Sequence, residues 1–113
     1  MSHRTVCKKY LKTTGPDELK VEVYYSLGGF NLWNYQEEPR GYWLSVTPVN
    51  HSEQNGVRFE SVVLGAGLKK FLKETKSDRR GGRAEKDAVE LAKQYEAELV
   101  NQVCIKEKLT LAA

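Results

Sequence analysis

The chain contains two histidines, which are its first candidates for acid-base chemistry near neutral pH. His3 lies close to the N-terminus, where we expect little order. His51 lies in a polar segment beside Ser52 and Glu53, and a general base at that position would need a neighbour that orients its ring. The sequence shows no such neighbour. A solvated loop histidine is therefore favoured over an enzyme that uses His51 and Glu53.

Metal and nucleotide sites also lack their usual spacings. Cys7 and Cys104 lie near opposite ends of the chain without a CxxC pattern, so we expect two reduced thiols and a cytoplasmic protein. The Glu37-Glu38 pair precedes a proline in a loop and does not indicate a carboxylate dyad. Residues 65–67 contain two glycines but match neither phosphate-binding pattern, GxxxxGK[ST] or GxGxxG. We expect no catalytic residue, no metal and no cofactor.

Positive charge is concentrated in one part of the chain. The net charge is only +3, and residues 1–68 carry seven basic and seven acidic side chains. Residues 69–86 carry eight basic side chains against three acidic ones. The candidate binding residues within this stretch are Lys69, Lys70, Lys73, Lys76, Arg79, Arg80 and Arg83. On a helix and a glycine-rich loop they could follow a phosphate backbone, although a solvated surface or a site for an acidic protein fits equally well.

Aromatic residues cluster between Tyr24 and Trp43, where seven of the eleven in the chain occur. We expect Tyr25 and Tyr42 in the core, with Tyr24 and Trp43 paired across strands on the other face. The loop residues that could stack on bases or contact a protein are Trp33, Tyr35 and Arg40. For Trp33, a ring folded back over the edge of the sheet is an equal alternative.

Hydrophobic periodicity defines the elements that would position these residues. Apolar alternation predicts strands over residues 5–13, 19–27, 42–49 and 57–64. Pro48 predicts that the third strand ends at a sheet edge, and residues 50–56 form a polar connection that finishes in an Asn-Gly turn. Apolar residues three and four positions apart then predict a short helix over 68–75 and a long one over 83–103.

The predicted fold class is α+β, an antiparallel four-stranded meander followed by a short and a long helix packed on one face, in the order β-β-β-β-α-α. Residues 1–105 should form a single compact domain and residues 106–113 a flexible C-terminal tail. No apolar stretch approaches the roughly 20 residues that span a bilayer, so we expect no membrane association. The long helix is compatible with a monomer or a homodimer.

Three phrases carry a resemblance to a group of known proteins: residues 24–29 (YYSLGG), 39–42 (PRGY) and 44–49 (LSVTPV). They resemble segments of small uncharacterised accessory proteins of bacterial phages and conjugative mobile elements. Such genes often encode compact binders, including nucleic-acid-handling proteins and anti-CRISPR inhibitors of host defence. The order of strands and helix is also similar to single-strand-binding folds of the transcriptional-coactivator type, a likeness of topology that does not fix function.

The sequence therefore favours a non-catalytic binding protein that engages nucleic acid through residues 69–83, with Trp33, Tyr35 and Arg40 contributing. The alternative is a protein-directed inhibitor that uses the aromatic loop for contact and the charged segment for steering. Its target would be a host nucleic-acid-binding protein.

Overall fold

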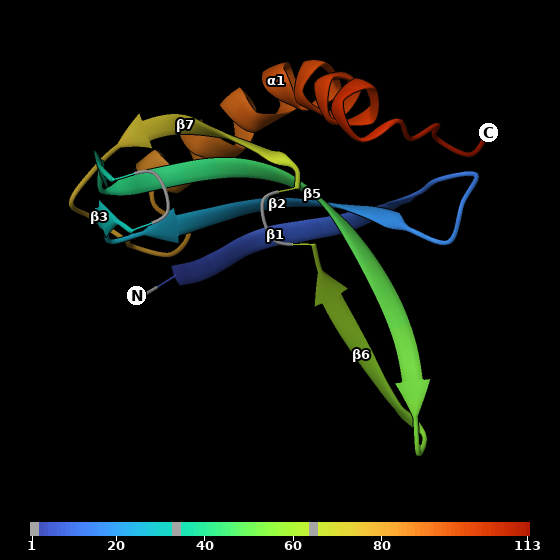
Figure 1. Cartoon of the computed structure of the whole chain (residues 1–113). Helices are drawn as coiled ribbons and strands as arrows, with labels where there is room; N and C mark the ends of the chain where they lie inside the picture. Colours follow the sequence, from blue (N-terminus) through green and yellow to red (C-terminus); the bar gives the residue numbers. More distant parts are fainter. Residues whose placement is uncertain (1–2, 33–34, 64–65) are drawn as a thin grey trace.

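The computed structural model describes residues 3–32, 35–63 and 66–113, which form seven strands and one helix (Figure 1). The elements are β1 (His3–Lys12), β2 (Glu18–Ser26), β3 (Gly29–Asn31), β4 (Gln36–Glu38), β5 (Gly41–Gln54), β6 (Val57–Val62), β7 (Leu68–Glu74) and α1 (Arg83–Glu107). A five-stranded sheet has the order β1-β2-β5-β6, with β7 also paired to β5, and β3 and β4 form a separate two-stranded sheet. The predicted order of four strands and two helices is wrong, because one predicted helix is a strand and two short strands were missed.

The hydrophobic core lies between the main sheet and α1, which crosses one face of the sheet (Figure 1). Alternation in β2 turns Leu19, Val21 and Val23 towards the helix, and Leu44 and Val46 on β5 lie beside them. The helix contributes five buried residues: Ala88, Ala92, Leu99, Val100 and Val103. Burying each large side chain stabilises the fold by about 1.5–3 kcal/mol. The periodic stripe predicted for residues 83–103 is therefore confirmed.

Strand β7 replaces the helix predicted over residues 68–75. It runs antiparallel to β5, from Val46↔Leu68 to Gly41↔Glu74, with a register shift between Tyr42 and Trp43. Leu68 and Leu72 pack towards the core, and Phe71 packs on Trp43 on the other face. Apolar residues on both faces of the strand thus give spacings of three and four that resemble a helical face. The unpaired edge of β5 needs hydrogen-bonding partners, and this tertiary demand outweighs local helix periodicity.

Strand β5 also continues five residues beyond its predicted end, so Pro48 does not terminate it. The β7 ladder ends at Val46 and the β6 ladder begins at Val49, which leaves Pro48 opposite the interruption between the two ladders. A proline is tolerated at such a break. Beyond it, β5 and β6 form a hairpin that leaves the sheet on the side away from α1 (Figure 1).

The C-terminal residues that were predicted as a flexible tail lie against the end of β1. The backbone N–H of Thr14 donates to the carbonyl of Thr110 at 2.8 Å, and that of Ala112 donates to Lys12 at 2.9 Å. Helix α1 ends at Glu107, and the left-handed conformation of Lys108 (φ 55°) directs the chain back towards the sheet.

Candidate functional site

The three lysines of β7 do not share a face, because a strand directs successive side chains to opposite sides. Lys69 lies on the face away from α1, over the Trp43 ring at 4.8 Å and paired with Glu38. Lys70 and Lys73 lie on the helix side, where Lys70 covers the Tyr95 ring at 4.5 Å and Lys73 pairs with Asp87 at 3.0 Å. Each of the three therefore has a partner within the protein. The continuous basic helix face expected from the sequence is absent.

The remaining basic candidates gather between β7 and α1. Lys76, Arg79 and Arg80 are exposed in the connection, and Arg83 is the exposed first residue of α1. We call these four residues the basic loop. Within the described ranges 3–32, 35–63 and 66–113, none of the four forms an ion pair. Asp78 is the only carboxylate between positions 76 and 83, so this segment carries a net charge of +3.

Backbone contacts fix the path of the basic loop. The guanidinium of Arg4 donates to the carbonyl of Asp78 at 2.8 Å and pairs with Glu85 at 3.6 Å. The Glu85 carboxylate also accepts from the N–H of Gly81, one residue before the N-cap Gly82. These contacts hold the backbone, and the basic side chains extend from it without a carboxylate partner.

The connection from β2 to β5 reaches the same end of the sheet, where Arg40 joins it to the basic loop. Arg40 Nε donates to the Tyr25 hydroxyl at 2.6 Å, and that hydroxyl donates to the carbonyl of Thr75 at 3.2 Å. The N–H of Thr75 in turn donates to the carbonyl of Arg40 at 3.2 Å. The connection from β2 to β5 and the segment that begins at Thr75 are thus neighbours in space.

The two-stranded sheet β3–β4, which we call the aromatic hairpin, presents apolar side chains at this end. Phe30 is 54% exposed and Tyr35 is 78% exposed, with ring centroids 6.3 Å apart in an edge-on arrangement. Leu32 is 75% exposed. Trp33, the other predicted aromatic contact, lies outside the described residues. The predicted core positions of Tyr25 and Tyr42 are confirmed.

Tyr24 and Trp43 are register partners, as predicted, and they lie on the face away from α1. Trp43 packs against Phe71 at a centroid distance of 5.0 Å, and Tyr24 stacks on the His3 ring at 4.1 Å. Burial raises the pKa of the Tyr24 phenol far above its usual value, and the carboxylates of Glu38 and Glu22 add to this effect. The Tyr24 hydroxyl therefore remains protonated at physiological pH.

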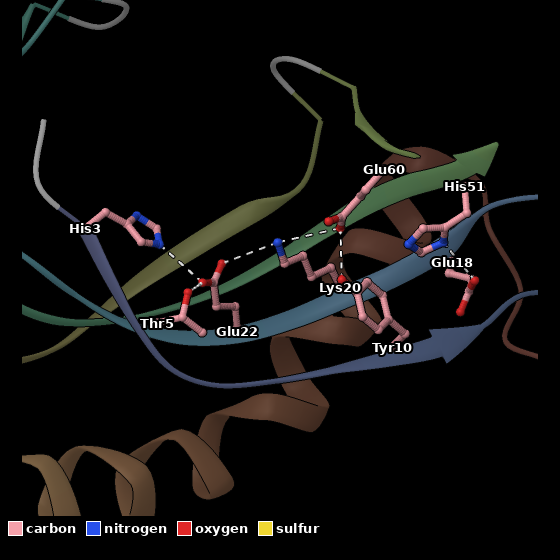
Figure 2. Close-up of polar contacts among 8 residues, drawn as sticks. All are labelled: His3, Thr5, Tyr10, Glu18, Lys20, Glu22, His51 and Glu60. Carbon is pink, nitrogen blue, oxygen red and sulfur yellow. Dashed lines mark hydrogen bonds and ion pairs between the residues drawn. The ribbon is translucent and has the colours of Figure 1, made fainter. Parts of the chain in front are cut away.

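A second group of polar side chains spans β1, β2 and the β5–β6 hairpin on that same face (Figure 2). We call this group the polar cluster: His3, Thr5, Tyr10, Glu18, Lys20, Glu22, His51 and Glu60. Its most buried member, Glu22, is 7% exposed, accepts a hydrogen bond from Thr5 and lies 3.2 Å from His3 Nε2. Lys20 lies between two carboxylates, 4.0 Å from Glu22 and 3.6 Å from Glu60. Each of the three carboxylates of the cluster therefore has a hydrogen-bond or ion-pair partner within the protein.

His51 has the orienting partner that the sequence did not reveal. Its Nδ1 lies 3.1 Å from the Glu18 carboxylate, and its ring packs edge-on against Tyr10 at 5.1 Å. Glu53 is exposed and faces Arg58 across the hairpin. No described serine, threonine or cysteine hydroxyl or thiol is hydrogen-bonded to His51, so a nucleophile-base pair is not formed here.

An open cavity of about 420 Å³ lies beside the polar cluster. Its charged lining residues are already engaged, since Glu22 contacts Thr5 and Lys69 contacts Glu38. Within the described part of the chain, no group of three or more histidine, cysteine, aspartate or glutamate residues could hold a metal ion. The polar cluster therefore fastens the β5–β6 hairpin to the sheet.

Sequence reasoning missed the polar cluster because its members come from four strands. Glu18 and His51 are 33 positions apart, and Tyr10 and Glu60 are 50 apart. The polar positions 18, 20 and 22 of β2 alternate with the core residues and could have identified one polar face. Only the bend of the hairpin brings β6 over that face.

Comparison with protein-family models, curated proteins and solved structures finds no significant match to this chain. The resemblance to accessory proteins of mobile elements thus stays a prediction. None of the described helical residues forms a segment long and apolar enough to cross a membrane.

Proposed function

We propose that this chain is a non-catalytic protein that binds single-stranded nucleic acid at the end of the sheet where the basic loop meets the aromatic hairpin. One observation carries the proposal: four basic side chains without carboxylate partners lie at the same end of the sheet as the exposed rings of Phe30 and Tyr35. Eight of the other fourteen lysines and arginines, all within the described residues, form an ion pair with a carboxylate, including Lys9 with Glu96 and Lys20 with Glu60.

Phosphate binding would use the charge that the fold leaves uncompensated. Three of the four basic-loop residues are arginines, whose planar guanidinium groups can donate two hydrogen bonds to one phosphate. Because Arg4 and Glu85 hold the loop backbone, these side chains start from a fixed position. A pre-ordered backbone lowers the entropic cost of binding.

Base stacking would use the aromatic hairpin. Tyr35 and Phe30 expose about half or more of their surface, and each unpaired base has a flat face that can stack on such a ring. Arg40 lies between the hairpin and the basic loop, and its exposed side chain can extend the same surface. Stacking together with phosphate contacts favours a single strand over a duplex, whose bases are already stacked.

The test is binding of labelled single-stranded and double-stranded DNA and RNA across a salt series. We expect micromolar affinity for single strands, with log K falling linearly with log salt. The variant Arg79→Glu/Arg80→Glu/Arg83→Glu should lose binding. The milder triple alanine variant should lower the slope by about 2, since each lost phosphate contact removes roughly 0.7.

A matched control changes the net charge equally at a distant place. Lys8, Lys12 and Lys108 are exposed and form no ion pair among the described residues, so their triple glutamate variant shifts the charge by the same amount. This control should keep most of the affinity. Equal loss of affinity in the two triple glutamate variants would mean that net charge alone explains the binding, which would contradict a site at the basic loop. Absence of binding at low salt would also overturn the proposal.

A protein target is the second candidate, favoured by the exposed apolar surface of Phe30, Leu32 and Tyr35. An interface of this kind depends on a few large side chains more than on charge. If the chain captures a protein partner, Tyr35→Ala should weaken that complex strongly while the salt dependence stays shallow. Cys7 and Cys104 are both free, as in a reducing compartment, so we place either activity in the cytoplasm.

A further inference from the structure

Strand β6 forms an open edge of the main sheet, and it lacks the features that hinder the two outer strands β1 and β7 from pairing with another chain. The outer strands β1 and β7 each carry three lysines, and β1 also has a bulge between Thr5 and Cys7. Lysines and bulges on edge strands hinder pairing with another chain. Strand β6 has no lysine and no proline, and all six of its residues are exposed.

The hairpin places this edge away from the rest of the molecule. It projects from the sheet on the side opposite α1 (Figure 1), and no described strand pairs with β6 except β5. Val57 and Phe59, on its outer face, are 52% and 47% exposed. A free row of backbone donors and acceptors thus lies next to exposed apolar side chains.

The turn geometry decides which backbone groups point outward. Asn55 and Gly56 have φ values of 53° and 77°, the two-residue type I′ turn, and Gln54 faces Val57. The N–H of Val57 therefore points towards β5. Because backbone direction alternates, positions 57, 59 and 61 pair with β5, and Arg58, Glu60 and Val62 present their N–H and C=O groups outward.

Only a few antiparallel registers between two copies of β6 satisfy this alternation. One places Arg58 opposite itself, and another places Glu60 opposite itself, so both bring like charges together. The register centred on Phe59 pairs Arg58 of each copy with Glu60 of the other, twice by symmetry. It also brings the two Phe59 rings together on the outer face.

We propose that the partner of this edge is a second copy of the same chain, joined by antiparallel β6–β6 pairing about a two-fold axis at Phe59. Charge complementarity selects the register, and the contact is isologous, so it closes at two copies. Within each copy, Glu60 is already held by the Tyr10 hydroxyl at 3.2 Å and by Lys20 at 3.6 Å. The carboxylate is thus ordered before the partner's Arg58 arrives.

Sedimentation velocity over a concentration series tests the assembly. The wild-type chain of 12.9 kDa should sediment as a dimer with twice that mass. Arg58→Glu and Glu60→Arg should each weaken dimerisation roughly tenfold or more, because two attractive pairs become repulsive. An equimolar mixture of the two variants should restore the dimer, since every cross-strand pair is then opposite in charge.

Glu98→Arg is the matched control, because this exposed residue gives the same change of charge as Glu60→Arg but lies on α1, on the side of the sheet away from β6. It should leave dimerisation unchanged. Circular dichroism of each variant separates loss of assembly from loss of fold. A wild-type monomer at all concentrations, or a mixture that stays monomeric, would overturn the proposal.

A cysteine scan tests the register itself. Directly opposed residues of a non-hydrogen-bonded antiparallel pair have Cα atoms about 4.5 Å apart, within reach of a disulfide. Phe59→Cys should therefore form a covalent dimer on mild oxidation, whereas Val57→Cys, which would face Ser61, should not. The wild-type chain under the same oxidation corrects for Cys7 and Cys104. Equal cross-linking of the two variants would refute this register.

Discussion

Gly41 tests whether residues 68–74 form a strand against β5, because the β7 backbone passes directly over the place where its Cβ would lie. A Cβ atom added to Gly41 would lie 2.1 Å from the carbonyl oxygen of Lys73 and 3.0 Å from Cα of Glu74. Both are backbone atoms, so no side-chain rotation relieves the overlap. The φ of +153° is also poorly accessible to alanine.

The expected cost of Gly41→Ala follows from these two effects. Overpacking costs about 1–3 kcal/mol and an unfavourable backbone conformation about 1–2 kcal/mol more, so we expect a loss of about 2–5 kcal/mol. At roughly 4 °C per kcal/mol for a domain near this size, the melting temperature should fall by about 8–20 °C. Urea unfolding followed by circular dichroism gives the free energy directly.

Gly56→Ala is the matched control. Gly56 also has a positive φ, +77°, but no atom outside its chain neighbours lies within 4 Å of the added Cβ. We expect the conformational cost alone, about 1–2 kcal/mol. Equal losses in the Gly41→Ala and Gly56→Ala variants would refute the close packing of β7 on β5. A helix over residues 68–75 would give that same result, because no strand would then lie against Gly41.

Two further predictions concern buried or paired carboxylates. Burial raises the pKa of Glu38, but hydrogen bonds from Lys69 and Asn31 outweigh it and hold the pKa below its usual value of 4.5. This contribution to stability is present above pH 4.5 and is lost as the pH falls through the folded pKa, so Glu38→Gln should flatten the acid limb of stability measured by urea unfolding. Parallel curves would contradict this. Glu22→Ala leaves the Thr5 hydroxyl without its acceptor and should cost about 1–3 kcal/mol in thermal unfolding, more than Glu22→Gln, which keeps a neutral acceptor. Equal losses would assign the effect to charge alone.

The parts of the fold that were predicted correctly depend on local patterns. Strand β2 alternates core and polar residues without interruption, and α1 keeps one apolar stripe over its length. Neither needs information from elsewhere in the chain. The same holds for the Tyr24–Trp43 pair, since alternation alone fixes the face of each residue once two strands are aligned.

The errors arose where tertiary pairing overrides local sequence. Apolar residues on both faces of β7 made this strand resemble a helix. The gap between the two ladders of β5 is the reason why Pro48 is tolerated, and it is not visible in the sequence. Residues 50–54 are polar, yet the Asn-Gly turn pairs them with β6. Both faces of this segment are exposed or half-buried, so its residues show no hydrophobic alternation that would indicate a strand.

The candidate site was likewise predicted only in part. Composition located the basic segment, and the exposure of Tyr35 and of the basic loop agrees with the surface positions expected for them. The sequence could not show that Lys69, Lys70 and Lys73 are engaged internally, because their partners lie in other elements. It also gave no means to join Arg40 to Thr75, which depends on the buried Tyr25 hydroxyl.

Strand β5 explains why the two proposals can be tested independently. Its first half pairs with β7 and begins beside the basic loop, and its second half pairs with β6. From Gly41 to Ser52, the residue opposite Phe59, eleven steps of about 3.3 Å span at most about 36 Å. Charge reversal in the basic loop changes no residue of the β6 edge, and variants of β6 change no residue of the basic loop. In a dimer joined at Phe59, the two basic loops would lie up to about 70 Å apart, so each could hold a separate stretch of one strand and the second contact would be favoured by its effective concentration.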